Sequence, residues 1–281
     1  MNAIEIRGLT KKYSDFTLDD INLTLPQGCI MGLIGENGAG KSTTIKLIMN
    51  MIHRDAGEIK VLGQDNRQNF EEVKEDIGVV LDESYFPEVI TAKQVNKIMS
   101  YTFKNWDEQV YFSYLDKFSL PHNKLFKDYS RGMKMKLAIA VALSHHARLL
   151  ILDEATSGLD PIIRDEILDV FYDFNKDDNH SIFISSHIVS DLEKVCDYIA
   201  FIHKGKLVFC EEKDRLLEEY AILKCSKEDF NSIDPDAVKG KRIGDYGVEA
   251  LVLRDRMPAG ITLNKASIED IIIYLVREDR K

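Results

Sequence analysis

The sequence contains no apolar run long enough to cross a membrane. A spanning helix needs about 20 largely apolar residues, whereas the longest apolar stretches here cover residues 137–143, 271–276 and 149–152. The N-terminal segment contains Glu5 and lacks an apolar core followed by a cleavage site, so we do not expect a secretion signal there. If the protein acts at a membrane, another chain must supply the spanning part.

Cysteines are few, and basic residues are outnumbered by acidic ones. The four cysteines form no CxxC pair, which indicates neither a zinc site nor a redox motif and favours a reduced, cytoplasmic protein. Lys and Arg number 37 against 47 Asp and Glu, which gives a net charge of −10. An acidic chain is poorly suited to binding a phosphate backbone. We therefore expect no nucleic-acid partner.

The sequence does contain an alternation of strand and helix patterns. Its 281 residues, 44% of them hydrophobic, predict about two domains with a buried core. Nearly continuous apolar runs at residues 29–35, 149–152 and 181–185 predict strands covered on both faces. Helical patterns lie between them, including residues 131–145 and a helix that Asp160 and Pro161 begin. This alternation predicts an α/β fold with a largely parallel sheet.

The pattern changes near residue 216. Short β-like runs at residues 221–225 and 248–253 precede a final helix from Ser267, where Ser-x-x-Asp resembles a capping signal. We therefore predict one domain over residues 1–215 and a small α+β domain over residues 216–281.

A glycine-rich segment carries the strongest chemical signal. Gly35 to Ser42 read GENGAGKS, which fits the phosphate-binding pattern G-x-x-x-x-G-K-[ST]. Glycines let backbone N–H groups approach phosphate oxygens, Lys41 neutralises the phosphates and the Ser42 hydroxyl takes one Mg²⁺ position. A chance glycine-rich turn is the alternative. The buried strand before it and the apolar-faced helix after it favour a P-loop NTPase.

Two adjacent acids end the apolar run at residues 149–152. Most adjacent acidic residues are simply solvated. A phosphate loop upstream instead favours a role for these two in nucleotide chemistry. Asp153 is predicted to hold Mg²⁺ through its water shell. Glu154 is predicted to orient and polarise the attacking water.

Three further segments complete a family pattern. Tyr129 to Met133 open the helix before the acidic strand, Ser157 to Asp160 follow that strand, and Ser185 to His187 end the next one. In this order and spacing, residues 3–209 resemble the ATP-binding subunit of an ABC transporter, with closest resemblance to the exporter branch. The resemblance implies an ABC-type ATPase core with an N-terminal antiparallel β subdomain and a helical subdomain at about residues 84–145.

The resemblance assigns roles to matching positions. Tyr13 would stack on adenine, with Phe16 as its substitute, and His187 would contact the γ-phosphate and help to hold the attacking water. Ser130 and Gly132 would cap the γ-phosphate bound to the other subunit, and Asp160 would lie at the subunit interface. The triphosphate loop would comprise Gly35, Glu36, Asn37, Gly38, Ala39, Gly40, Lys41, Ser42 and Thr43.

Two positions depart from the family pattern. Arg131 stands where the signature segment normally has a glycine. Asp82 stands where the family has a glutamine that touches Mg²⁺, so we expect an additional negative charge beside the metal. The following residues, including Tyr85 and Phe86, would form the socket for a membrane subunit.

Other functional classes fit the sequence less well. Asn175 to Asp178 match the guanine-reading pattern NKxD, but they lie in a polar loop after a helix, where we expect a solvated helix end. A non-transport ABC ATPase is disfavoured because no coiled-coil heptads separate Lys41 from Ser130. A purely regulatory module is disfavoured by the intact catalytic positions, and an importer subunit remains the closest alternative.

The sequence therefore predicts an ATPase that uses ATP and Mg²⁺ and powers separate membrane-spanning subunits, most closely those of an exporter. It would act as a head-to-tail dimer with itself or a homologous subunit. The membrane subunits would dock near Asp82, Tyr85 and Phe86 and hold it at the cytoplasmic face of the membrane.

Overall fold

The protein is described by a computed structural model that covers residues 1–68, 70–82, 86–245 and 247–278. The chain divides into two compact units, Met1–Phe209 and Cys210–Lys281. The boundary predicted after residue 215 falls inside helix α8 (Lys213–Glu219). Among the helices of the described residues, none is both long and apolar enough to span a membrane.

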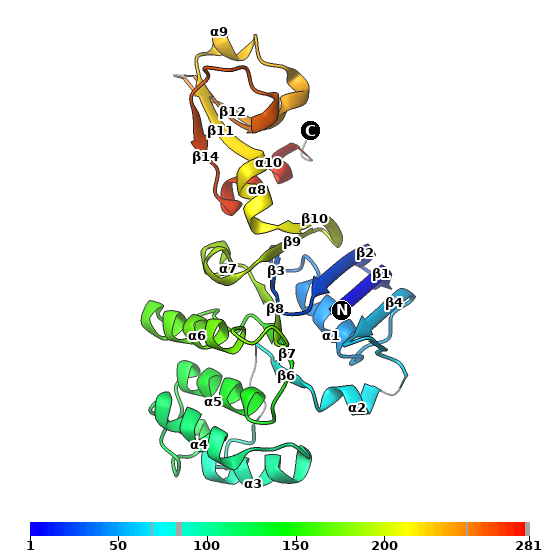
Figure 1. Cartoon of the computed structure of the whole chain (residues 1–281), viewed down its shortest axis with the longest axis vertical. Coiled ribbons are helices and arrows are strands. Elements are labelled where there is room, and N and C mark those ends of the chain that lie inside the picture. The colour runs from blue at the N-terminus through cyan, green and yellow to red at the C-terminus, as the bar shows by residue number, and fades with distance from the viewer. Residues whose placement is uncertain (69, 83–85, 246, 279–281) are drawn as a thin grey trace. The chain divides into compact units, whose positions relative to one another are not determined.

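A six-stranded sheet in the order β10-β9-β3-β8-β7-β6 forms the centre of the first unit (Figure 1). Neighbouring strands pair in parallel from β9 through β3, β8 and β7 to β6. Strands β3, β7 and β8 are buried along their whole length, which confirms the prediction that these strands are covered on both faces of the sheet. The strands are β3 (Ile30–Ile34), β6 (Ile77–Val80), β7 (Leu149–Asp153), β8 (Ser181–Ser186), β9 (Tyr198–His203) and β10 (Lys206–Glu212).

The strand register brings distant sequence segments to one edge of this sheet. Asp153 at the end of β7 pairs with Ser185 of β8, and Ile34 at the end of β3 pairs with Ser186. Because the carboxyl ends of parallel strands lie at the same edge, the phosphate loop, the acidic pair and His187 all follow strands that end there.

Helices flank the central sheet (Figure 1). Helix α1 (Lys41–Ile48) follows β3 directly, and α7 (Val189–Val195) follows β8. Helix α6 (Pro161–Phe174) begins as predicted, because the Asp160 carboxylate accepts hydrogen bonds from the N–H groups of Ile162 and Ile163.

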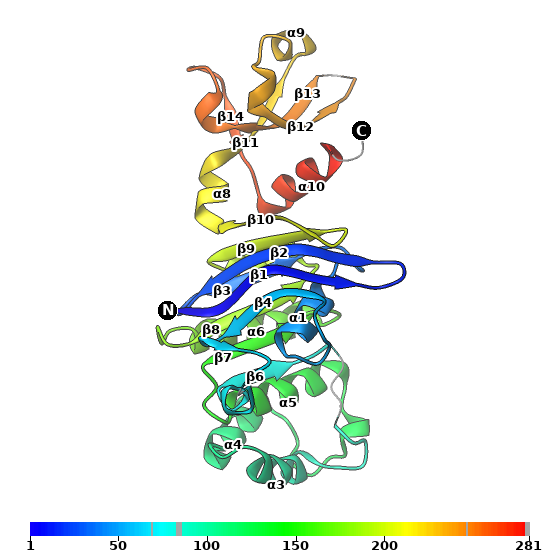
Figure 2. The ribbon, with the colours of Figure 1, turned by 90° about the vertical axis from the view of Figure 1, so that its right-hand side faces the viewer.

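An antiparallel sheet in the order β2-β1-β4-β5 forms the predicted N-terminal subdomain (Figure 2). In β2, Ile21, Leu23 and Leu25 are buried whereas Asn22 and Thr24 are exposed, so the alternation in the sequence gives one buried face. The strands are β1 (Asn2–Lys12), β2 (Thr17–Pro26), β4 (Ala56–Val61) and β5 (Gln64–Asp65).

Helices form the middle of the first unit, as the sequence predicts. A capping box between Thr91 and Gln94 begins α3, and Asp107 caps α4. Tyr111 is fully buried and its ring lies 5.2 Å from that of Trp106, so it belongs to the core, whereas Tyr101 is 82% exposed. The elements are α2 (Phe70–Lys74), α3 (Ala92–Thr102), α4 (Glu108–Lys117), the 3-10 turn η1 (Phe126–Asp128) and α5 (Arg131–Leu143).

The second unit is an α+β fold with an antiparallel sheet in the order β12-β13-β11-β14. The predicted cap is present, since the Ser267 hydroxyl accepts from the Asp270 N–H and the Asp270 carboxylate accepts from the Ser267 N–H. Besides α8, the elements are β11 (Tyr220–Cys225), α9 (Lys227–Phe230), η2 (Pro235–Ala237), β12 (Val238–Ile243), β13 (Val248–Leu253), η3 (Arg254–Arg256), β14 (Leu263–Lys265) and α10 (Ile268–Glu278).

Candidate active site

The loop between β3 and α1 has the backbone shape of a phosphate cradle. Gly38 and Gly40 have φ angles of +82° and +117°, which favour glycine. A Cβ on Gly40 would lie 2.8 Å from Leu18 Cδ1, whereas a Cβ on Gly38 would meet nothing within 4 Å. One glycine therefore packs the loop onto the protein, and the other leaves its outer side open to a ligand.

Lys41 places a buried positive charge under this loop. Its side chain is only 6% exposed, and its Nζ donates to the Gly35 carbonyl at 2.7 Å and lies 3.2 Å from Glu154 Oε1. A buried ammonium group needs such partners. A phosphate group that enters the loop can replace the carboxylate as the partner of Lys41.

The acidic pair lies beside Lys41. The Asp153 carboxylate is buried and accepts a hydrogen bond of 2.6 Å from the Ser185 hydroxyl. Glu154 has a φ of +53°, and its carboxylate bridges two groups, with Oε1 near Lys41 and Oε2 2.7 Å from His187 Nδ1. The predicted catalytic pair, Glu154 and His187, is therefore in direct contact.

These groups surround a hollow of about 670 Å³ at the carboxyl edge of the central sheet. Asp15 and Ser157 also line it, although the sequence predicts no role for them there. Among the predicted residues, Gly35, Ala39 and Asp153 are buried and do not line it. The lining residues are Tyr13, Asp15, Phe16, Glu36, Asn37, Gly38, Gly40, Lys41, Ser42, Thr43, Asp82, Glu154, Ser157 and His187.

Tyr13 and Phe16, the two residues predicted as alternatives for stacking on adenine, both line this hollow. The ring centroids of Tyr13 and Phe16 are 6.4 Å apart, and Tyr13 is 48% exposed. Lys11 Nζ lies 5.5 Å from the centre of the Tyr13 ring. Phe16 packs towards Gly40, because a Cβ there would lie 3.1 Å from its ring. Tyr13 therefore offers the more open ring, and Phe16 lies closer to the loop.

Three predicted residues lie outside the hollow. Ser130 caps α5 by accepting from the Met133 N–H, and Asp160 caps α6. Gly132 packs against α6, since a Cβ there would lie 2.8 Å from Ile163 Cδ1. One chain by itself does not bring Ser130, Gly132 and Asp160 to its own phosphate loop.

The two departures from the family pattern contact each other. Arg131 Nη2 donates to Asp82 Oδ1 at 3.2 Å, and both side chains are about half exposed. Nothing in the sequence indicates this pair, because the two residues lie 49 positions apart. Of the predicted docking residues, Phe86 packs edge-on against Phe126 with ring centroids 5.6 Å apart, and Tyr85 lies outside the described residues.

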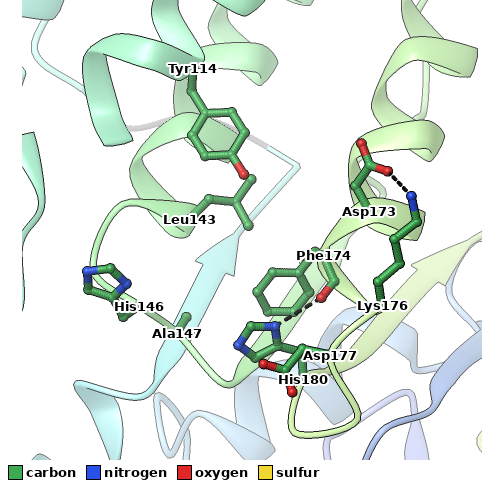
Figure 3. Close-up of a pocket in the computed structure, with 9 residues that line it drawn as sticks. All are labelled: Tyr114, Leu143, His146, Ala147, Asp173, Phe174, Lys176, Asp177 and His180. Carbon is green, nitrogen blue, oxygen red and sulfur yellow. Dashed lines mark hydrogen bonds and ion pairs between the residues drawn. The ribbon is translucent and has the colours of Figure 1, made fainter. Parts of the chain in front are cut away.

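The NKxD segment belongs to a different hollow, of about 650 Å³ (Figure 3). Lys176 and Asp177 line that hollow, and Lys176 pairs with Asp173 at 2.8 Å. The Asn175 side chain donates to the Gly28 carbonyl. Because this segment and the phosphate loop line separate hollows, the segment is not placed to read a base bound at the loop.

Comparison with known proteins identifies the family of the chain. The family model described as "ABC transporter" matches residues 18–157. The bacitracin transport ATP-binding protein of Bacillus licheniformis is 39% identical over 212 residues, which cover 73% of this chain and 68% of that protein. The lantibiotic transport ATP-binding protein of Streptococcus pyogenes is 34% identical over 215 residues, which cover 75% and 91%.

Solved structures have the same fold. A structure described as the ATP-binding subunit of an ABC transporter superposes with a TM-score of 0.68 at 25% identity, covering 76% of this chain and 91% of the other. A dimeric ATP-binding cassette bound to ADP and Pi gives a TM-score of 0.66 at 20% identity, covering 74% and 98%. The predicted P-loop NTPase fold is confirmed, and the chain belongs to the ABC transporter family as an ATP-binding subunit.

Proposed function

We propose that this chain hydrolyses ATP and thereby powers a separate membrane-spanning exporter. The observation that carries the proposal is the position of Glu154, whose two carboxylate oxygens contact Lys41 and His187 at the edge of the phosphate hollow. A carboxylate held between a phosphate-binding cation and a histidine is suited to general-base work on a water molecule.

The residues present fit a magnesium–triphosphate complex. Open space outside Gly38 and the buried Lys41 ammonium group suit phosphate, and the oxygens of Ser42 and Asp153 suit Mg²⁺, which prefers oxygen ligands. Asp82, on the wall of the hollow, is a further candidate for the metal. When bound, Mg²⁺ neutralises charge on the β- and γ-phosphates.

The side chains divide the work of hydrolysis. Lys41 exchanges Glu154 for a phosphate oxygen, which leaves the Glu154 carboxylate available to orient the attacking water and take up its proton. A neutral imidazole has a single N–H, so His187 can donate Nε2–H to the γ-phosphate once its Nδ1 no longer donates to Glu154. The aromatic ring of Tyr13 stacks on the adenine of ATP.

A second chain would complete the site. Ser130 and Gly132 lie at the N-terminus of α5, where helix N–H groups and the helix dipole favour an anion. They do not reach the hollow of their own chain. In a head-to-tail dimer, formed with itself or with a homologous subunit, each α5 N-terminus would cap the γ-phosphate bound by its partner, and Asp160 would lie at the interface.

Export is supported by the relatives, whose names describe bacitracin and lantibiotic transport. In this proposal, ATP closes the dimer, hydrolysis reopens it, and the movement passes to polytopic membrane subunits that dock near Asp82, Tyr85 and Phe86. The protein would thus be held at the cytoplasmic face of the membrane.

The test combines catalysis with partner capture. Glu154→Gln should lower the ATPase rate by about 10²–10⁴-fold while ATP binding is retained, and the exposed control Glu71→Gln should have no effect. Native co-purification should recover a stoichiometric polytopic membrane protein. Wild-type hydrolysis in Glu154→Gln would overturn the catalytic assignment, and a dimer that brings no membrane protein would overturn the transport assignment.

A further inference from the structure

Ser185 joins the two acidic residues of the active site. It is wholly buried near the end of β8, in register with Asp153 of β7. Its hydroxyl donates to Asp153 Oδ1 at 2.6 Å and accepts from the Glu154 N–H at 3.2 Å. One buried oxygen therefore contacts the side chain of one acid and the backbone of the next.

We propose that Ser185 is a positioning residue that sets the orientation of the Asp153 carboxylate for magnesium. A serine hydroxyl has a single proton to donate, and here that proton points at Asp153. With Oδ1 held, the carboxylate is fixed in rotation and presents its other oxygen in one direction. This inference rests on the proposed function, because it concerns the metal step of ATP binding and hydrolysis.

The backbone N–H of Glu154 has a second hydrogen-bond acceptor, so Asp153 and Glu154 depend on the Ser185 hydroxyl to different degrees. The Glu154 N–H also donates to the Ser185 carbonyl at 3.1 Å. An alanine at residue 185 would keep that carbonyl and lose only the hydroxyl. Removing the hydroxyl should therefore disturb Asp153 much more than Glu154.

A purely structural role makes a different prediction. A buried serine can simply satisfy neighbouring polar groups, and its loss would then lower stability without a specific effect on the metal. Groups that orient a metal ligand through a hydrogen bond typically change metal affinity or activity by about 10–100-fold when removed. Magnesium dependence therefore separates the two roles.

Ser181 provides a matched control on the same strand. It is also wholly buried in β8, but it lies at the opposite end and its hydroxyl accepts from the Gly28 N–H at 2.9 Å. Ser181→Ala removes an equally buried hydroxyl with no contact to Asp153. Ser185→Thr keeps the hydroxyl at residue 185, and Ser185→Cys keeps a group of similar size with a weak donor.

The experiment measures ATP affinity of the full chain by calorimetry, once in EDTA and once across a MgCl₂ titration. For Ser185→Ala we expect unchanged affinity in EDTA and about a tenfold or greater rise in the Mg²⁺ concentration needed for half of the magnesium effect. Ser185→Thr should restore the wild-type curve, and Ser181→Ala should match it. If Ser185→Ala fails to fold, Ser185→Cys, whose thiol donates only weakly, should still raise the Mg²⁺ concentration needed for half of the magnesium effect.

The outcomes separate this inference from the proposed function. A wild-type magnesium curve in Ser185→Ala, or an equal loss of affinity in EDTA, overturns the role of Ser185 alone. A wild-type chain that binds Mg²⁺ and ATP without hydrolysing ATP overturns the proposed catalysis and leaves the binding test valid. A wild-type chain that binds no ATP overturns both.

Discussion

A methyl group added at Gly38 tests whether phosphate approaches the loop backbone. Gly38 has a φ of +82°, and a Cβ there would meet nothing within 4 Å in the protein. Gly63, in the turn between β4 and β5, has a φ of +84° and equally open surroundings. An alanine would therefore meet the same backbone strain and the same free space at both positions, but only Gly38 lines the phosphate hollow.

The cost to stability should be the same at both positions. An alanine in the left-handed region costs about 1–2 kcal/mol, and neither methyl group adds a clash. For a domain of this size, each kcal/mol shifts the melting temperature by about 2–4 °C, so we expect Gly38→Ala and Gly63→Ala each to lower it by about 2–8 °C.

The cost to ATP binding should differ sharply. If the methyl group keeps phosphate oxygens from two backbone N–H groups, and each charge-assisted bond contributes about 1.5 kcal/mol, Gly38→Ala should weaken ATP binding about 100-fold. Gly63→Ala should leave the affinity unchanged. Thermal unfolding without nucleotide and calorimetric ATP titration measure the two effects. Equal ATP affinity in the two variants would refute the phosphate cradle.

Two further predictions concern charge. Asp82→Asn should raise the Mg²⁺ concentration needed for half-maximal ATPase activity, because it removes a negative charge from the wall of the hollow; superimposable Mg²⁺ titrations would remove Asp82 from the metal site. Burial lowers the pKa of His145, which is stacked on Phe103, below its ordinary 6.5. Only the unfolded chain then takes up this proton near pH 6.5, so the free energy of unfolding should fall as the pH drops below about 6.5. His145→Gln should flatten this fall in chemical denaturation, and parallel pH profiles for the two proteins would contradict the assignment.

Much of the fold follows from local patterns in the sequence. The continuous apolar run at residues 149–152 predicted a strand buried on both faces, and β7 has that burial along its whole length. The Asp160–Pro161 pair predicted the start of α6 because both residues act locally, through a side-chain cap and a fixed φ.

The site was predictable where chemistry is concentrated in one short segment. The phosphate loop needs its glycines, lysine and serine in fixed order, so its function is visible without the fold. The role of Ser185 was not visible, because its partner Asp153 is 32 residues away and only the strand register brings them together. Serine in a buried strand has no sequence signal that distinguishes a satisfied core residue from a positioning one.

The pair formed by Asp82 and Arg131 shows why departures from a pattern need the structure. Taken singly, an acid beside a phosphate site is unfavourable, and an arginine in place of a glycine obstructs close approach of the backbone. Together they form an ion pair across 49 residues of sequence, so each charge has a partner of opposite sign. With both partners about half exposed, the pair contributes at most about 1 kcal/mol to stability. Breaking the pair therefore costs little stability, so Asp82 can exchange Arg131 for a metal ion with little loss of folding free energy.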